Sequence, residues 1–288
     1  MRKFKLWNEE LTEFIDMSSD RCLVKDPDGL GIEMKLDIVE SVNGYYLQNR
    51  KASNTPIAFT LIFGIKGNAY ESYDIFTGFI NQYRKLVLEY QTNDQTLYRD
   101  VYLQRLGKTE KTIYNTLECK VALLPISPWY IPEIIEADYT YSSAYGNQFY
   151  NIDIEHNSGD SPINVEISVS NGTNNQFYGA RITVDNRVYY PNGTMWKSNE
   201  KQVVDFPNRQ FFKISYSGVS NILKVNTVDK KLQLIRGDGV IENLYGVHDL
   251  SKQSFLYIRN GTNNIAINPS GTLINASLHI KITYRRYV

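Results

Sequence analysis

One amphipathic helix in a chain otherwise patterned for β-strands is the feature that most limits the possible folds. Asn68 can cap a helix. Apolar residues then recur at three- and four-residue steps, at Tyr73, Phe76, Ile80, Tyr83 and Val87. This spacing predicts a helix with one apolar face packed on a sheet. No comparable pattern follows along the 288 residues, so we predict a mainly β protein with a single α-helix in its first half.

A proline-rich aromatic segment at residues 125–132 divides the chain, with the sequence Pro-Ile-Ser-Pro-Trp-Tyr-Ile-Pro. Proline cannot donate to a strand ladder, and it restricts the preceding residue to extended conformations, so no central strand is expected to continue through this segment. The chain length suits about two domains. We therefore predict one domain at 1–132 and a second domain at 133–275.

Alternating apolar residues predict the strands of the first domain. They lie at 34–38, 57–63, 86–90, 96–106 and 117–123. The first of these segments precedes Asn43-Gly44, a pair that tolerates the positive φ of a type I′ turn, so a hairpin is expected there. The first domain is thus predicted to be of the β-sandwich type, with one helix and one hairpin.

The second domain is predicted to be an antiparallel β-sandwich, because its strand patterns are short and separated by turn signals. The patterns lie at 163–169, 181–190, 211–216, 232–235 and 255–258. Three Asn-Gly-Thr tripeptides, beginning at Asn171, Asn192 and Asn260, are interpreted as hairpin turns. A last alternating segment at 278–284 either closes this sandwich or returns to the first domain, which 276–288 would then complete.

Composition limits the possible partners. Lys+Arg 31 and Asp+Glu 31 balance to zero formal charge, so no global attraction draws the chain to nucleic acid or an anionic membrane. The sequence shows neither a signal segment nor an apolar run that spans a bilayer, so folding in the cytoplasm of the producing cell is expected. Cys22 and Cys119 lack the spacing of a metal clip and are predicted to be reduced packing residues.

Patterns for metal or phosphate chemistry are weak. His156, His248 and His279 are isolated from one another and from the cysteines, which argues against zinc. Asp26-Pro-Asp28-Gly29 begins like a calcium loop, but the later ligands are missing, so it is interpreted as an aspartate-rich turn. No metal and no cofactor are expected.

Two further clusters offer alternatives to a purely structural protein. Asp153 and Glu155 point the same way from one predicted strand, as a glycoside hydrolase would need, but a solvated strand face explains them better. Tyr189, Tyr190 and Trp196 could stack on sugar rings, although aromatic residues more often fill the inner face of a sandwich. We therefore expect no enzyme, and we keep host cell-wall carbohydrate binding as the alternative function.

Several of these patterns together resemble the distal tail protein (Dit) family of long-tailed bacteriophages that infect Gram-positive bacteria. They are the Asp-Pro-Asp-Gly-Leu-Gly turn at 26–31, the strand at 57–63 leading through two glycines into the helix, the strand at 86–90, the Pro-Trp-Tyr boundary at 128–130 and the closing strand at 280–288. The resemblance covers the whole chain in organisation. It leaves open whether the particle is a phage or a tail-like bacteriocin.

The resemblance implies a structural virion protein that forms a homohexameric ring at the distal end of the tail tube and joins the tube to the baseplate or tail fibre. The first domain would surround a channel through which DNA passes, and the second would be a galectin-like or carbohydrate-module-like jelly roll. The implied partners are the tail tube protein and the baseplate hub and receptor-binding proteins, without a membrane. Assembly would take place in the bacterial host cytoplasm. Because sheet edges can extend a neighbour's sheet, we expect edge strands and hairpins to join the copies.

Overall fold

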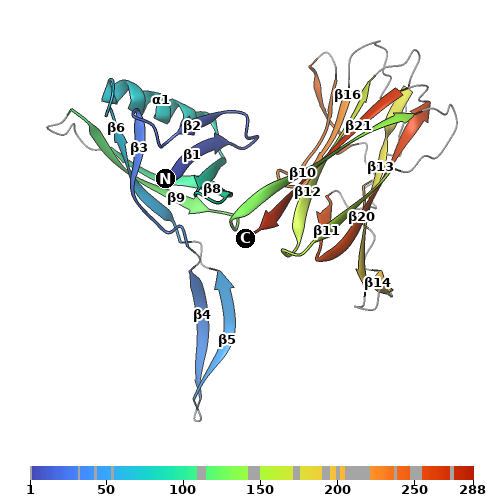
Figure 1. The fold of residues 1–288 in the computed structure, drawn as a ribbon, viewed down its shortest axis with the longest axis horizontal. Coiled ribbons are helices and arrows are strands. Elements are labelled where there is room, and N and C mark those ends of the chain that lie inside the picture. The colour runs from blue at the N-terminus through green and yellow to red at the C-terminus, as the bar shows by residue number, and fades with distance from the viewer. Residues whose placement is uncertain are drawn as a thin grey trace. The chain divides into compact units, whose positions relative to one another are not determined.

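The computed structural model describes residues 2–31, 33–41, 44–52, 55–108, 115–141, 150–170, 176–189, 195–198, 202–204, 221–236, 239–246, 255–272 and 276–288. In these ranges the protein is mainly β with one helix, as predicted (Figure 1). The chain divides into two compact units, Met1–Ile131 and Pro132–Val288.

The first unit holds the helix and the early strands. In chain order its elements are β1 (Lys3–Asn8), β2 (Phe14–Asp16), β3 (Cys22–Asp28), β4 (Met34–Ser41), β5 (Gly44–Ala52), β6 (Ile57–Phe63), α1 (Ala69–Gln82), β7 (Leu86–Gln91), β8 (Thr96–Lys108) and β9 (Leu117–Pro125). β10 (Tyr130–Tyr141) begins here, where Tyr130 pairs with Tyr98, and continues into the second unit.

Hydrogen bonding bends the main sheet of the first unit into a barrel. The antiparallel order is β2-β1-β7-β8-β9-β6-β3. β8 pairs with β7 through its first part, from Thr96 to Val101, and with β9 through its second part, from Val101 to Lys108, where a bulge lies between Leu103 and Arg105. The two ends of the order meet where Val24 N–H donates to the Met17 carbonyl at 2.9 Å. The sequence predicted a sandwich for this domain, whereas the structure has one curved sheet with only short free edges on β2 and β3.

The predicted helix is confirmed and packs on the barrel core, but it ends at Gln82, so Val87, expected on its apolar face, lies in β7 instead. The Asn68 side chain accepts a hydrogen bond from Tyr70 N–H at 3.0 Å, which caps the helix. Phe76 and Ile80 are buried, one turn apart on the same face. The Phe76 ring centroid lies 5.5 Å from that of Phe63 at the end of β6. α1 therefore covers the apolar core of the barrel at the end of β6.

The proline-rich segment is tied to the barrel by polar contacts. Arg99 Nε donates to the Ser127 carbonyl at 2.8 Å, and the Tyr130 hydroxyl donates to Asp100 Oδ1 at 2.9 Å. Arg99 and Asp100 are both buried, so these bonds satisfy groups that would be costly to leave unpaired. The segment is therefore part of the first unit up to the point where the second begins.

The proline-rich segment interrupts the strands as expected, because β9 ends at Pro125 and β10 begins at Tyr130, and Pro132 itself lies inside β10. In the second unit β10 is the end strand of its sheet and pairs with β21 (Ala276–Tyr287). An edge strand tolerates proline because only one side of it must donate to a neighbour. The expectation that no central strand continues through 125–132 is therefore confirmed.

The second unit contains the remaining strands. They are β11 (Tyr150–His156), β12 (Ser161–Ser170), β13 (Gln176–Tyr189), β14 (Met195–Ser198), β15 (Gln202–Val204), β16 (Asn221–Asn226), β17 (Lys231–Ile235), β18 (Ile241–Asn243), β19 (Tyr257–Ile258), β20 (Gly261–Thr272) and β21. The pattern at 211–216 and the turns at Asn171 and Asn192 lie outside the described residues.

Two antiparallel sheets enclose the core of the second unit. One has the order β18-β17-β16-β12-β21-β10, and the other joins β11, β20, β13, β14 and β15. Both sheets bury alternate residues in one shared core, among them Ile167, Ile182, Ile265 and Ile280. Of the two placements left open for 276–288, the structure has the strand in this unit, between β12 and β10.

The Asn260-Gly261 turn does not form the expected hairpin. β19 before it pairs with β12, whereas β20 after it pairs with β11 and β13 in the other sheet. The turn therefore carries the chain from one sheet to the other. Gly261 has a φ of +103°, and the Asn260 side chain accepts from Gly159 N–H at 2.8 Å. Asn-Gly signals a sharp turn, but the pairing of its flanking strands depends on the tertiary fold.

Gly64, between β6 and α1, supplies a test of this packing. Its φ is +84°, and a Cβ there would lie 2.5 Å from Ala69 Cβ. Gly67 has a similar φ of +95° but open space around it. We expect Gly64→Ala to lower the free energy of unfolding by about 1–3 kcal/mol more than the control Gly67→Ala, measured by urea unfolding. Equal losses in the two variants would contradict this account of the helix junction.

Candidate assembly surfaces

The predicted hairpin is confirmed as a separate two-stranded sheet, β4–β5. Its antiparallel pairing runs from Met34 opposite Ala52 to Ser41 opposite Gly44. Asn43, part of the expected type I′ turn, lies outside the described residues. Among the described residues the two strands form ladders with each other alone, so each has an outer edge without a strand partner.

One face of the hairpin carries an exposed apolar stripe. Met34, Leu36 and Ile38 alternate along β4 and are 38%, 48% and 57% exposed, and Leu47 on β5, opposite Ile38, is 58% exposed. An isolated two-stranded hairpin is at best marginally stable in water. Large exposed apolar side chains gathered on one face mark an interaction site. This apolar stripe is the first candidate assembly surface.

The hairpin is anchored where it leaves the barrel. The segment that contains the hairpin leaves the barrel after β3 and returns to it before β6. These two strands pair with each other at Asp28 and Ala58. Gly29 has a φ of +76°, and a Cβ there would lie 2.6 Å from the Pro56 carbonyl oxygen. Trp129 Nε1 donates to the Leu30 carbonyl at 2.9 Å. Both ends of this segment are therefore held close together at the base of the hairpin.

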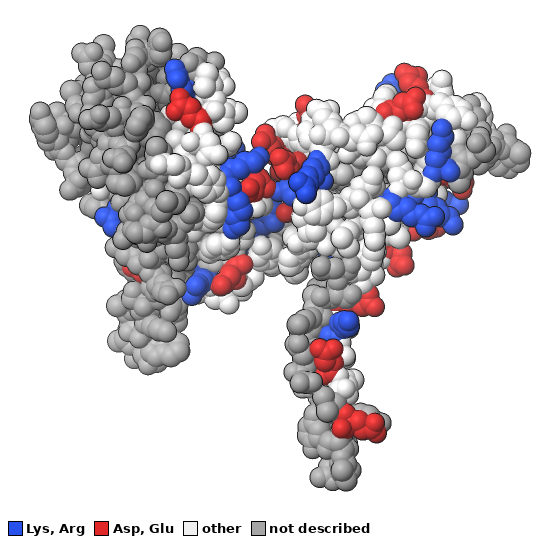
Figure 2. Space-filling model, turned by 180° about the vertical axis from the view of Figure 1, so that it is seen from behind, with Lys and Arg blue, Asp and Glu red and all other residues white. Residues whose placement is uncertain are grey.

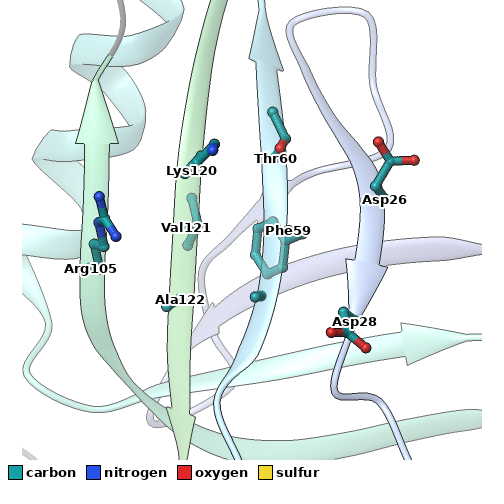
Figure 3. A pocket seen from close by; sticks show the side chains of 9 residues that line it. Asp26, Asp28, Phe59, Thr60, Arg105, Lys120, Val121 and Ala122 are labelled. Atoms are coloured by element: carbon teal, nitrogen blue, oxygen red, sulfur yellow. The ribbon is translucent and has the colours of Figure 1, made fainter.

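The second candidate surface is a shallow depression of about 260 Å³ on the outer face of β3, β6, β9 and β8 (Figure 3). Its floor is made of small side chains, because Ala58 on β6 pairs with Ala122 on β9. Thr60 and Lys120 form the next pair on the same face. This floor leaves space above the sheet that larger residues would fill.

Charged side chains of opposite sign line the two sides of this depression. Asp26 and Asp28 lie on β3, whereas Arg105 on β8 and Lys120 on β9 lie on the other side (Figure 3). All four are exposed, and among the described residues no ion pair joins the carboxylates to the cations. We call the depression, with Ala58, Thr60 and Ala122, the charged trough.

A bulge places the two aspartates at the trough. The register of β3 against β6 shifts between Lys25 and Asp28, and Asp26 has a φ of +50°. The sequence interpretation of these residues as a simple turn was wrong, because they belong to the end of a paired strand. The alternation of small and charged residues at 118–122 was the available signal for the trough, but it does not reveal which strands lie side by side.

Charges of both signs are otherwise dispersed. Figure 2 shows acidic and basic residues interspersed among uncharged ones on the visible face, which agrees with the balanced composition. On and next to β4 the described charged residues are Glu33, Lys35, Asp37 and Glu40. This strand therefore carries more negative than positive charge in its described part.

The candidate saccharide residues lie on two neighbouring strands. Tyr189 ends β13 and Trp196 lies in β14, and these strands pair with each other next to a register shift at Val188/Tyr189. Tyr190 lies outside the described residues. The backbone thus brings Tyr189 and Trp196 to adjacent strands.

The carboxylates considered for hydrolysis are engaged in cross-strand hydrogen bonds. Asp153 Oδ1 accepts from Asn264 Nδ2 at 2.7 Å, and Glu155 Oε1 accepts from Thr262 Oγ1 at 2.6 Å. Each partner stands directly opposite on β20. These bonds give both exposed carboxylates a role in strand pairing.

The histidines are also held by local contacts. His156 is buried, its Nε2 lies 2.7 Å from the Gly159 carbonyl oxygen, and burial lowers its pKa. His279 Nδ1 lies 2.8 Å from Asp138 Oδ1, and His248 falls outside the described residues. In the part of the chain that the structure describes, no three His, Cys, Asp or Glu residues are grouped to hold a metal.

Both cysteines are free and buried, as predicted for packing residues. Burial raises the pKa of Cys22 to about 12, with a smaller contribution from the nearby Asp16. The thiol therefore stays protonated at neutral pH, where it is unreactive. Among the described helical residues, none forms a helix long and apolar enough to cross a membrane.

Comparisons with known proteins found one family model and several solved structures that this chain resembles. Residues 3–126 match the family model described as distal tail protein, N-terminal domain. A chain in the structure of the phage P2 baseplate in its activated conformation with Ca has a TM-score of 0.64 and 18% identity, covering 98% of both chains. The corresponding structure with Sr has the same TM-score and 17% identity, also over 98% of both.

A structure of phage SPP1 Dit gives a TM-score of 0.46 at 7% identity, covering 97% of this chain and 98% of that one. No curated protein sequence matches the chain. The matched family segment contains the whole barrel, α1 and the β4–β5 hairpin. Residues 3–126 therefore match the N-terminal domain of distal tail proteins, and the likeness in fold to the chain of the phage P2 baseplate extends over nearly the whole chain.

Proposed function

We propose that this protein forms a hexameric ring at the distal end of a tail tube and connects the tube to the baseplate or tail fibre. The ring stoichiometry follows from the family resemblance. Residues 1–132 would form the ring, and DNA would pass through its lumen. A chain with zero formal charge suits such a channel, because a strongly basic lumen would retain the phosphate backbone.

The second domain would act as a docking hub for other tail-tip proteins. We propose that it is a galectin-like or carbohydrate-module-like jelly roll, which its two antiparallel sheets around one core support. Its partners would be baseplate hub and receptor-binding proteins, while the ring contacts the tail tube protein. The particle would belong to a phage, or a related tail-like particle, with a Gram-positive host.

The β4–β5 hairpin is the observation that carries the ring proposal. The barrel has few open strand edges of its own, whereas the hairpin presents two edges and an apolar stripe. A head-to-tail contact, in which one surface of each copy meets a different surface of the next, closes into a ring when its rotation fits a whole number of copies. A hairpin that reaches one neighbour makes this kind of contact.

Leu36→Asp tests the ring directly. The purified parent is expected to scatter light as a particle of six 33.2 kDa chains and to appear as a ring by electron microscopy. Leu36→Asp should shift the mass towards the monomer, since burying a charge weakens each contact by about 2 kcal/mol or more.

Ile75→Asp, at a 54% exposed position on α1, is the matched control and should leave the mass unchanged. Both variants should unfold at the parent temperature, because neither side chain is buried in the monomer. A parent that stays monomeric at every concentration, alone and with its tube protein, would remove the ring proposal.

Saccharide binding by the second domain is the alternative proposal, supported by the adjacent strand positions of Tyr189 and Trp196.

If these aromatic rings stack on sugars, host cell walls should retain the parent protein. Trp196→Ala should then lower the retained fraction about tenfold or more, measured by sedimentation with purified walls. Trp129→Ala is unsuitable as a control because Trp129 is buried, so Phe14→Ala, at a 47% exposed site in the first unit, serves instead. Failure of the parent to sediment with the walls would rule out this alternative.

A further inference from the structure

We propose that the charged trough of one copy receives the β4–β5 hairpin of the next copy, with the apolar stripe lying on the alanine floor. The inference rests on the proposed ring, and it names the surface that the hairpin contacts. Both surfaces are open in the single chain, and both belong to the unit that the family match covers.

The two surfaces are complementary in side-chain size. The floor has Ala58 and Ala122 as a cross-strand pair, which leaves the depression between the charged sides. The hairpin offers Met34, Leu36 and Ile38 at every second position, and such side chains recur about every 7 Å along a strand. Facing sheets pack by interdigitation, so large residues on one face fit against small residues on the other.

The charges determine the orientation. Glu40 is two residues beyond Ile38 on β4, so it shares the face of the apolar stripe, whereas Asp37 lies on the opposite face. Arg105 and Lys120 stand beside the alanine floor without an ion pair, among the described residues, to the carboxylates across the trough. With the stripe on the floor, Glu40 reaches this cationic side.

A second copy is the occupant that fits these observations best. A two-stranded hairpin with an exposed apolar face needs a surface to cover it, and the trough supplies apolar contact flanked by the opposite charge. The contact joins two different patches, so each copy uses its hairpin on one neighbour and its trough on the other. This arrangement is head-to-tail and allows ring closure.

Charge exchange tests the pairing. Glu40→Lys and Lys120→Glu should each raise the apparent dissociation constant of the assembly about three- to tenfold, as measured by mass photometry over a dilution series. The double variant, carrying both changes in one chain, should return to within about threefold of the parent. Asp37→Lys is the matched control, with the same charge change on the opposite face, and should resemble the parent.

Mixing tests the direction of the contact. Leu36→Asp blocks the stripe, and Ala58→Trp fills the floor at an exposed position, so each variant alone should be monomeric. A mixture retains one intact stripe and one intact floor, and should form one-to-one dimers that cannot grow into rings. Thermal unfolding of each variant at the parent temperature confirms that the fold is intact.

The outcomes separate this inference from the proposed ring. A parent that never associates removes the ring itself. A parent that assembles, with loss on Leu36→Asp but no change on Lys120→Glu or Ala58→Trp, keeps the ring and overturns the trough as the hairpin's site. No dimer in the mixture, or no recovery in the double charge exchange, also overturns it.

Discussion

Unpaired strand edges are the constraint on which the rest of this structure depends. A backbone edge exposes N–H and C=O groups that favour pairing with another chain, and folded proteins close or cover most such edges. The barrel of the first unit closes its own order of strands where Val24 N–H meets the Met17 carbonyl, which leaves β4 and β5 as the described pair without a neighbouring strand. The Trp129 hydrogen bond and the close approach at Gly29 hold the base of this hairpin against the barrel.

The sequence predicted those helices and strands whose formation depends on residues close to one another in the chain. The cap at Asn68 and the spacing of Phe76 and Ile80 were sufficient for the helix, because its apolar face is read directly from the sequence. Strict alternation was sufficient for β6, β9 and β12, whose buried residues take every second position. These patterns predicted a mainly β protein with one helix, and the alternation at 34–38 before Asn43-Gly44 predicted the hairpin.

Features that depend on distant pairing were not predictable from one sequence. The sequence did not show that Pro132 lies inside an edge strand, because β10 pairs with β21, which lies at the far end of the chain. Asn260 was expected in a hairpin, but the strands before and after it belong to different sheets. The charged trough forms only where four strands lie side by side, and two of its residues, Asp26 and Lys120, are 94 positions apart in the sequence. No local signal joins them.

Hydrogen–deuterium exchange of the hairpin amides, measured as a function of protein concentration, tests the central claim most directly. Amides at 34–41 and 44–52 are expected to exchange rapidly when the protein is dilute and monomeric, because a lone hairpin opens readily. They should become protected as the protein assembles, while amides of β12 in the second core stay equally protected throughout. Hairpin exchange that remains the same in the monomer and the assembly would contradict the claim that the hairpin joins the copies.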